Sequence, residues 1–464
     1  MSHHMPDPNK NVNLTIDGQP VTVPEGTKIL EAALKANVFI PTLCDHPDLC
    51  RRAVCRICVV ECDGRGKLLA ACANDVWEGV KIVTNNSRIT NIRKTIIELL
   101  LANHPQECLT CPASTDCKLQ SLARLYGIRE TVFSRCVVNR GAVNRQPISN
   151  GGALLRDMDK CVKCGRCVEA CQTVQTVRAI NSSGRSVNYR ITTAYNQPYE
   201  DSPCVFCGQC QEVCPVGAIY ENDQSAGAWA AINDTERRTA VQFGKTLCAR
   251  LAAASGIPEG EVNPGKTVTA LRRLGFDKVY DSQTAADLAA SELSLELQNR
   301  VKNNGKPLPI ISACSQSAVK FIGNFYPDLV PRLSPSRNMR EIFASLVEDK
   351  TTVVSVEPCV CNKGLSPSPS SPDITLTVKE LARMFRLAGI DIASLPESHF
   401  DPLKAAPGEP AAGLKGIKCL TVNGLGEARA VLDSIAKGEC DAALVEINSC
   451  SRADGCACLV STGP

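Results

Sequence analysis

Eight cysteines in the middle of the chain are spaced like the ligands of iron-sulfur clusters. They form the pattern C-x2-C-x2-C-x3-C twice, closed by Cys-Pro, at Cys161, Cys164, Cys167, Cys171, Cys204, Cys207, Cys210 and Cys214. Soft thiolate sulfur is the ligand that such clusters select, and the clusters carry electrons. Disulfides or a pair of zinc ions would have to explain both this repeated spacing and the closing Cys-Pro. The spacing therefore predicts two 4Fe-4S clusters and a protein that transfers electrons.

The repeated pattern is that of two-cluster ferredoxins, in which the fourth ligand of each cubane comes from the far end of the other run. We therefore expect one cluster at Cys161, Cys164, Cys167 and Cys214. The second cluster is expected at Cys204, Cys207, Cys210 and Cys171.

Four cysteines nearer the N-terminus have the spacing C-x10-C-x2-C-x13-C, at Cys44, Cys55, Cys58 and Cys72. A plant-type ferredoxin loop has a shorter first gap, C-x4-C-x2-C, but it also wraps around a binuclear cluster and has a distant fourth ligand. This set therefore predicts a 2Fe-2S cluster. Cys50 and Cys62 fall outside the pattern, and we expect them to be small apolar fillers near the loop.

A third set of four possible ligands combines one histidine with three cysteines, at His104, Cys108, Cys111 and Cys117. One histidine and three cysteines also suit tetrahedral zinc. The neighbouring sets favour a third 4Fe-4S cluster, because a cluster continues an electron path that a zinc ion would interrupt. A neutral imidazole in place of a thiolate changes the charge of the cluster and hence its reduction potential.

The segments around these ligands predict an α+β chain of several domains. Residues 12–16 and 21–23 alternate like strands around Asp17-Gly18, and Thr27 is expected to cap a helix whose apolar positions are Ile29, Leu30, Ala33 and Leu34. This predicts a ferredoxin-like grasp domain at 10–82. A helical domain for the His/Cys cluster, with a linker, follows at 83–144, and its helix at 89–101 leads to His104. The two-cluster ferredoxin domain is expected at 145–225 and a last domain at 226–464.

Composition narrows the possible partners and the compartment. The 464 residues include 27 cysteines, 51 basic and 48 acidic side chains, and the net charge is +3. So small a charge gives no field that would attract nucleic acid or an anionic membrane. We find no secretory signal and no apolar run long enough to span a bilayer, so we expect a cytoplasmic protein whose thiols bind metal.

The order of these modules resembles the N-terminal half of large iron-only hydrogenases, of the iron-sulfur subunit of complex I and of several formate dehydrogenases. Motifs such as 41–44 (PTLC), 102–105 (ANHP) and 204–210 (CVFCGQC) carry the resemblance. Only about 240 residues follow position 224, too few for the molybdopterin domain of a formate dehydrogenase. Segments 271–279, 325–329 and 380–384 instead resemble the iron-only hydrogenase catalytic domain. The last domain is therefore identified as a truncated α/β hydrogenase-like domain.

In that family four cysteines bind the hydrogen-activating cluster, and the resemblance implies that two of them are missing in this chain. Cys359 and Cys450 occupy ligand positions, whereas Ser315 and Asp454 stand where the other two cysteines belong. Cys314 keeps the position of the proton-relay cysteine. A serine hydroxyl is a poor substitute for thiolate at a cluster. We therefore expect that this chain has lost the hydrogenase activity of the family.

Other positions of the hydrogen site have changed as well. Glu357 replaces the family's methionine, and Asn362 replaces the lysine that would hold the cyanide of the diiron unit. Only about ninety residues separate Cys359 from Cys450, so the glycine-rich cover of the diiron unit is expected to be deleted.

Three strand-like runs, 309–312, 353–356 and 443–447, end just before Cys314, Cys359 and Cys450. The carboxyl ends of strands are where open α/β sheets build binding sites. A further 4Fe-4S cluster near these three cysteines, helped by Cys361, Cys456 or Cys458, is one interpretation. A vestigial pocket lined by free thiols is the other.

The chain has no nucleotide-binding fingerprint of its own. The nearest glycine-rich loop, 423–428, is expected only to turn a strand into a helix. By resemblance, one partner would be a flavin- and NAD-binding subunit, alongside a small thioredoxin-like 2Fe-2S subunit. Ferredoxin and a separate oxidoreductase, such as a formate dehydrogenase, are the other expected partners. The sequence thus predicts an electron-transfer subunit of a hetero-oligomeric, electron-bifurcating complex. A divergent hydrogenase that makes or oxidises hydrogen is the alternative.

Overall fold

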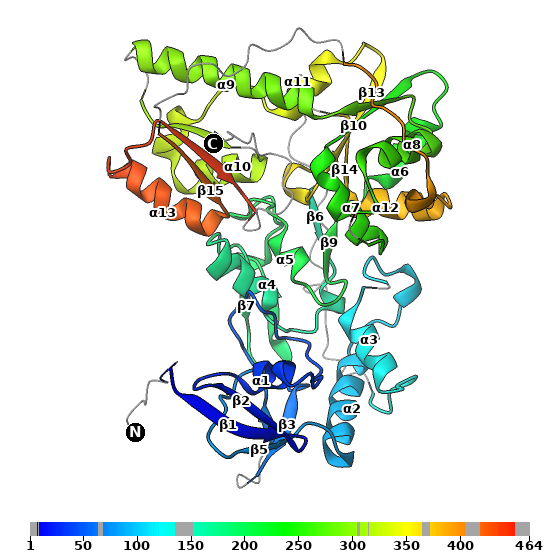
Figure 1. Ribbon diagram of the computed structural model, residues 1–464, viewed down its shortest axis with the longest axis vertical. Helices are drawn as coiled ribbons and strands as arrows, with labels where there is room; N and C mark the ends of the chain where they lie inside the picture. The colour runs from blue at the N-terminus through cyan, green and yellow to red at the C-terminus, as the bar shows by residue number, and fades with distance from the viewer. Residues whose placement is uncertain are drawn as a thin grey trace.

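The computed structural model describes residues 7, 9–63, 68–114, 116–134, 152–258, 260–303, 307–313, 315–363, 372–403 and 418–450. Figure 1 shows the chain as a series of modules, with the N-terminal sheet at the bottom and two α/β sheets at the top. A segment with short helices and strands joins them in the middle of the view. Cys136, Cys314, Asp454, Cys456 and Cys458 lie outside the described residues.

The N-terminal module is a five-stranded sheet in the order β2-β1-β5-β3-β4, with one short helix. Its elements are β1 (Asn11–Ile16), β2 (Gln19–Pro24), α1 (Ile29–Lys35), β3 (Val59–Cys62), β4 (Leu68–Ala70) and β5 (Lys81–Val83). β1 pairs antiparallel with β2 and parallel with β5. Every second residue of β1 is buried, as the alternating sequence predicts.

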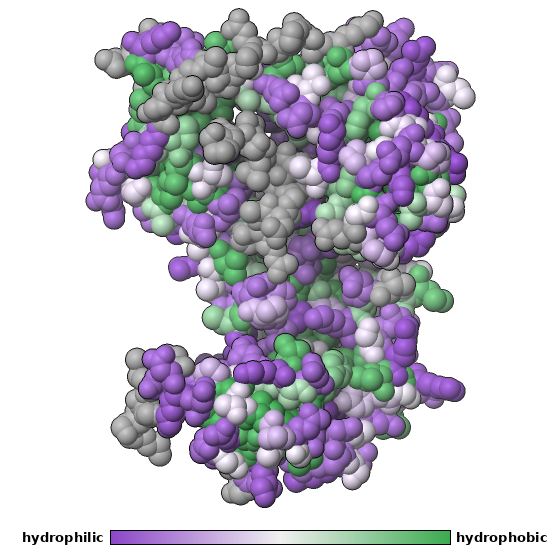
Figure 2. Space-filling model, in the orientation of Figure 1, coloured by the Kyte–Doolittle hydropathy of each residue, from purple (hydrophilic) through white to green (hydrophobic). Residues whose placement is uncertain are grey.

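The expected start of α1 is wrong by one residue. Lys28 is the N-cap, and its backbone N–H donates to the Glu31 carboxylate at 3.1 Å. The Thr27 hydroxyl instead donates to the Pro24 carbonyl oxygen at 2.7 Å, within the turn before the helix. Ile29 and Ala33 are buried as expected, but Leu34 is 76% exposed. In Figure 2, apolar surface is visible on this lower module.

A helical module and the segment with the repeated cysteines follow. The helical module contains α2 (Ser87–Ala102), a 3-10 turn (Cys108–Thr110) and α3 (Lys118–Leu125). The next segment contains β6 (Leu154–Arg156), a 3-10 turn (Met158–Lys160), α4 (Arg166–Glu169), a π-helical turn (Ala170–Val174), β7 (Asn181–Ser183), β8 (Arg190–Thr192), α5 (Gln209–Glu212) and β9 (Ile219–Glu221). β6 pairs antiparallel with β9, so the two ends of this segment are held together.

The C-terminal half has a first parallel sheet in the order β11-β10-β13-β14. Its strands are β10 (Arg238–Phe243), β11 (Lys278–Asp281), β13 (Thr351–Glu357) and β14 (Ile374–Thr377). The helices of this part are α6 (Ser225–Ile232), α7 (Cys248–Ser255), α8 (Pro264–Leu274), α9 (Gln283–Asn303), α11 (Met339–Leu346) and α12 (Val378–Leu387). Residues of β10, β13, α7, α8 and α12 form one buried core.

A second parallel sheet has the order β12-β16-β15. It contains β12 (Ile310–Ala313), β15 (Cys419–Asn423) and β16 (Leu444–Asn448), with the helices α10 (Gln316–Phe325) and α13 (Leu425–Ala436). The loop at 423–428 therefore joins a strand to a helix, as expected. The three runs that end near cysteines are strands, as expected, and they are divided between the sheets, with β13 in the first and β12 and β16 in the second.

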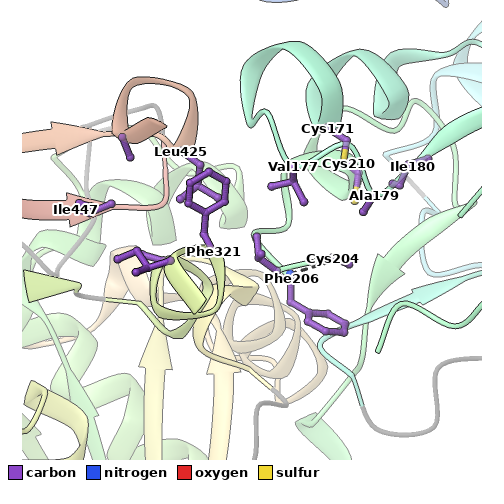
Figure 3. Packing of buried hydrophobic residues seen from close by; sticks show 14 of the residues in the cluster. Cys171, Val177, Ala179, Ile180, Cys204, Phe206, Cys210, Phe321, Leu425 and Ile447 are labelled. Carbon is purple, nitrogen blue, oxygen red and sulfur yellow. Dashed lines mark hydrogen bonds between the residues drawn. The ribbon is translucent and has the colours of Figure 1, made fainter. Parts of the chain in front are cut away.

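The middle segment and the second sheet share one hydrophobic core. Figure 3 shows Phe206 and Val177 of the middle segment in the same cluster as Phe321 of α10, Leu425 of α13 and Ile447 of β16. Gln175 is fully buried between the two parts, where its amide donates to the Ser449 carbonyl oxygen at 3.3 Å and accepts from the Leu425 N–H at 3.1 Å. The middle segment is thus packed against this sheet as one folded unit.

None of the described helices is both long enough and apolar enough to cross a membrane.

The closest backbone approach in this interface predicts a test of its packing. A Cβ atom on Gly426 would collide with the carbonyl oxygen of Val174. We expect Gly426→Ala to lower the thermal midpoint of the anaerobic protein, with a loss of about 1–3 kcal/mol, because overpacking forces the backbones apart. Gly323→Ala is the control, since that site in α10 has open space, and it should stabilise by about 0.5–1 kcal/mol. Equal midpoints for the two variants would contradict this packing.

Candidate metal centres

Four of the repeated cysteines surround a cavity in the middle segment. Cys161, Cys164, Cys167 and Cys214 line it, together with apolar residues such as Met158, Val216 and Ile219. Cys214 belongs to the second cysteine run, yet it interacts electrostatically with all three cysteines of the first run. This is the crossed grouping that the sequence predicts for the first cubane.

The other four repeated cysteines form a second group. Cys171 interacts electrostatically with Cys204, Cys207 and Cys210. The π-helical turn at 170–174 carries Cys171, and π-turns add one residue to a helical turn, often at functional sites. This group shares the core that joins the middle segment to the second sheet.

The two cysteine runs start with the same backbone conformation. Lys163 and Gly165 have φ values of +56° and +79°, and Phe206 and Gly208 have +57° and +78°. In each loop a backbone N–H donates to the first cysteine at 3.4 Å, from Lys163 to Cys161 and from Phe206 to Cys204. Such turns aim successive N–H groups at one anionic centre. Hydrogen bonds to sulfur are one factor that sets the potential of a cluster.

Burial keeps the thiols of Cys164 and Cys204 protonated when no metal is bound. It raises the pKa of Cys164 and of Cys204 to about 12. A buried thiolate needs a compensating positive charge, and cluster iron supplies it while displacing the proton. The donor set therefore fits soft, cationic metal centres.

The four cysteines of the expected 2Fe-2S loop lie in two pairs. The Cys58 and Cys72 sulfurs are 3.4 Å apart, and Cys44 forms a hydrogen bond with Cys55. These hydrogen bonds lower the pKa of Cys58 and of Cys55 to about 7 and raise the pKa of their partners. Two thiolates on each iron is what a binuclear cluster with four cysteine ligands requires.

His104 has an orientation that suits a ligand. Its Nδ1 lies 2.8 Å from the Pro105 carbonyl oxygen, so Nδ1 carries the proton in that hydrogen bond. Its Nε2 is buried and has no hydrogen-bond partner. Burial lowers the pKa of the imidazole, which favours the neutral form that binds metals. Cys108 and Cys111 interact electrostatically with Cys117, so this set is also brought together.

Within the described parts of the chain, no three His, Cys, Asp or Glu side chains converge on a point that a single metal ion would fill. We therefore group the expected cluster ligands by three observations: the nearness of their sulfurs, the cavity that four cysteines line and the unpartnered Nε2 of His104.

The centres lie next to one another. The Arg166 guanidinium, beside the first cubane group, donates to the Asp45 carbonyl oxygen, beside the 2Fe-2S loop. Arg52 forms an ion pair with Glu169 at 3.0 Å between the same modules. Gly217 has no room for a side chain, because a Cβ there would lie 2.6 Å from the sulfur of Cys111. The first cubane group is thus the junction between the 2Fe-2S set and the His104 set.

Comparison with known proteins identifies the family. Residues 237–416 match the family described as iron only hydrogenase large subunit, C-terminal domain. The NADP-reducing hydrogenase subunit HndD of Solidesulfovibrio fructosivorans is 34% identical over 435 residues, which cover 87% of this chain and 74% of the relative. The chain belongs to the iron-only hydrogenase large-subunit family. Iron hydrogenase 1 of Clostridium pasteurianum is 30% identical over 412 residues, which cover 84% of this chain and 70% of that protein.

The N-terminal half of this family member has wider relatives. It matches a 2Fe-2S iron-sulfur cluster binding domain at 9–87, the NADH-ubiquinone oxidoreductase-G iron-sulfur binding region at 93–131 and a 4Fe-4S dicluster domain at 160–218. The NADPH-Fe(3+) oxidoreductase subunit alpha of Geobacter sulfurreducens is 32% identical over 208 residues, 45% of this chain and 24% of that protein. The chain is thus a multi-cluster iron-sulfur protein related to NAD(P)H-linked oxidoreductase and hydrogenase subunits.

The positions at which the resemblance places the hydrogen site hold a network of polar side chains. Ser315 is 2% exposed and caps α10, accepting from the Ala318 N–H at 3.3 Å and donating to the Ser449 hydroxyl at 2.9 Å. Asn362 donates to the Glu357 carboxylate at 3.1 Å. Glu357 also accepts from the Ser355 hydroxyl at 2.7 Å.

Three thiols meet beside this network. The sulfur of Cys359 lies 3.0 Å from that of Cys361 and 3.8 Å from that of Cys450. Although β13 and β16 belong to different sheets, their carboxyl ends bring Cys359 and Cys450 together. Cys314, the third expected cysteine, lies outside the described residues.

Cys50 and Cys62, which were both expected to be small apolar fillers, differ in burial. Cys62 is buried, as a small filler should be, whereas Cys50 is exposed.

Two polar residues near the clusters were not predicted from the sequence. Arg156 and Tyr199 lie beside the cubane groups, yet neither belongs to a spaced motif. Their only signal is burial without a full set of hydrogen bonds, and this becomes visible only in three dimensions.

The orientation of His104 predicts how its cluster responds to a change of ligand. We expect His104→Cys to retain iron but to lower the reduction potential of one cluster, because a thiolate adds negative charge. Redox titration followed by electron paramagnetic resonance (EPR) measures the shift. His399→Cys, at an exposed histidine of the C-terminal half, is the control and should leave all potentials unchanged. Retention of all iron by His104→Ala would contradict the ligand role.

Proposed function

We propose that this chain is an electron-transfer subunit of an NAD(H)- and ferredoxin-linked, electron-bifurcating complex. It would pass electrons between a flavin- and NAD-binding subunit and a partner enzyme such as a formate dehydrogenase. A small thioredoxin-like 2Fe-2S subunit would belong to the same hetero-oligomer. The hydrogenase-like domain of the chain would make no hydrogen of its own.

The contacts of Ser315 support the proposal that the hydrogenase-like domain makes no hydrogen. A cysteine ligand of the family's cluster is replaced by a hydroxyl that is buried and engaged with the α10 N-terminus and with Ser449. A hydroxyl held in this way is a weak ligand for iron. Asn362 supports the same conclusion, because its amide is held by Glu357 and lacks the positive charge of the family's lysine.

The adjacency of the centres supports an electron path through the chain. Arg166 joins the first cubane group to the 2Fe-2S loop, and Gly217 brings the set containing Cys111 beside the same group. At the other end, a Cβ on Gly208 would lie 2.5 Å from the side chain of Val360, which stands between Cys359 and Cys361. The second cubane group therefore lies against the three-thiol site.

The cofactors in this proposal are one 2Fe-2S cluster and three 4Fe-4S clusters. A fifth cluster, near Cys314, Cys359 and Cys450, is a further candidate. It is favoured by the 3.8 Å distance between the sulfurs of Cys450 and Cys359. Cys361 lies 3.0 Å from Cys359 and would offer a further thiol. Such a cluster would extend the path into the hydrogenase-like domain.

A nicotinamide-linked partner is supported by the relatives. HndD is named as a subunit of an NADP-reducing hydrogenase, and the Geobacter protein as a subunit of an NADPH-Fe(3+) oxidoreductase. Cys108 is exposed and Leu109, its neighbour, is 99% exposed, so the His104 set reaches the surface. Electrons could enter or leave the chain at this point.

The test combines infrared spectroscopy under carbon monoxide, hydrogen evolution and an iron and sulfide count on one anaerobic, maturase-exposed sample. We expect no cyanide or carbonyl bands, no hydrogen and about fourteen irons, the sum for one binuclear and three cubane clusters. About eighteen irons would add the fifth cluster. Diatomic-ligand bands together with hydrogen evolution would overturn the proposal and favour a divergent hydrogenase.

A further inference from the structure

Arg156 is a buried cation beside the first cubane group. It is 7% exposed and lines the same cavity as Cys161, Cys164, Cys167 and Cys214. One terminal nitrogen donates to the Ile191 carbonyl oxygen at 2.8 Å and to the Met158 sulfur at 3.1 Å. Its Nε is buried and has no hydrogen-bond partner.

The charge of Arg156 has no carboxylate partner within ion-pairing distance among the described residues. Its neighbours differ in this respect, since Lys160 pairs with Asp157 at 2.9 Å and Arg52 with Glu169 at 3.0 Å. An unpaired buried charge is strongly destabilising unless something of opposite sign compensates it. The anion that this arginine requires must therefore lie in the cavity.

Tyr199 lies between Arg156 and the second cysteine run. The Arg156 guanidinium carbon is 5.1 Å from the centre of the Tyr199 ring, and that ring packs edge-on against Phe206 at 6.3 Å. The tyrosine is 3% exposed, and its hydroxyl is buried without a partner. It interacts electrostatically with Cys210, Cys204 and Cys167, which belong to both cubane groups. The Tyr199 hydroxyl therefore lacks an acceptor for its proton. A cluster sulfur near these cysteines would supply one.

We propose that Arg156 is the counter-charge of the cubane in this cavity and raises its reduction potential, and that the Tyr199 hydroxyl donates to a sulfur between the two cubanes. This inference rests on the proposed electron-transfer function. A cubane with four thiolates is anionic and becomes more so when it accepts an electron. A fixed positive charge beside it therefore stabilises the reduced state more than the oxidised state. Arg156 and Tyr199 are positioning residues that set where the electron resides.

The competing interpretation is structural, since Arg156 also holds the Ile191 carbonyl. Two substitutions separate the two roles. Arg156→Gln keeps a donor for that carbonyl and removes the charge, whereas Arg156→Lys keeps the charge and loses the planar geometry. Tyr199→Phe keeps the ring beneath Arg156 and removes only the hydroxyl. Arg185→Gln is the matched control, because Arg185 is an exposed arginine of the same segment.

The experiment is a redox titration of the full chain with its clusters, followed by EPR, with iron counted on each sample. We expect one cubane signal to move to lower potential in Arg156→Gln and to stay near the wild-type value in Arg156→Lys. Tyr199→Phe should also lower a cubane potential, and Arg185→Gln should change nothing.

The outcomes separate this inference from the proposed function. Cubane signals with unchanged potentials in Arg156→Gln would overturn the inference and leave the electron-transfer function intact. If Arg156→Gln fails to retain its iron, Tyr199→Phe decides, and unchanged potentials there would overturn the inference. A wild-type chain that holds no cubanes would overturn both.

Discussion

The buried contact between the middle segment and the second sheet of the C-terminal half is the constraint on which the rest of the structure depends. Gln175 is fully buried there and satisfies both its amide groups across the interface, with Ser449 and Leu425. Separation of the two parts would expose their shared apolar core to water, and this cost holds them together, while the Gln175 hydrogen bonds fix how they fit. Because of this contact, the second cubane group keeps a fixed position against Val360 and the three thiols.

Much of the candidate site was predictable because ligand spacing is a local property of the sequence. A Cys-x-x-Cys turn brings two sulfurs together whatever surrounds it, and the crossed grouping of Cys171 and Cys214 follows from the repeat. β1, β2 and α2 also lie where the sequence predicted two strands and a helix. The sheets were less predictable, since strand pairing depends on contacts far apart in the sequence. β13 and β16 read as equivalent runs, yet each lies in a different sheet, and only their ends meet.

Single residues without a repeated pattern escaped prediction for a different reason. Ser315 was expected to be a lost ligand, but its role as the N-cap of α10 became visible only with the helix in place. Arg156 and Tyr199 gave no signal at all. Their proposed role is inferred from two buried polar atoms without hydrogen-bond partners, the Arg156 Nε and the Tyr199 hydroxyl. A sequence does not show which polar atoms lack partners in the fold.

The crossed grouping has a consequence for how the protein is made. Cys161, Cys164 and Cys167 leave the ribosome well before Cys214, which closes their cavity from the other side. Between them, the chain must form β7, β8 and the loop that carries Cys204. The first cubane therefore cannot be completed before Cys214 has been synthesised, although more than half of the chain still follows that residue. Until then the three early thiols lack their fourth partner, so a complete ligand set for iron and sulfide exists only after this whole segment has been translated.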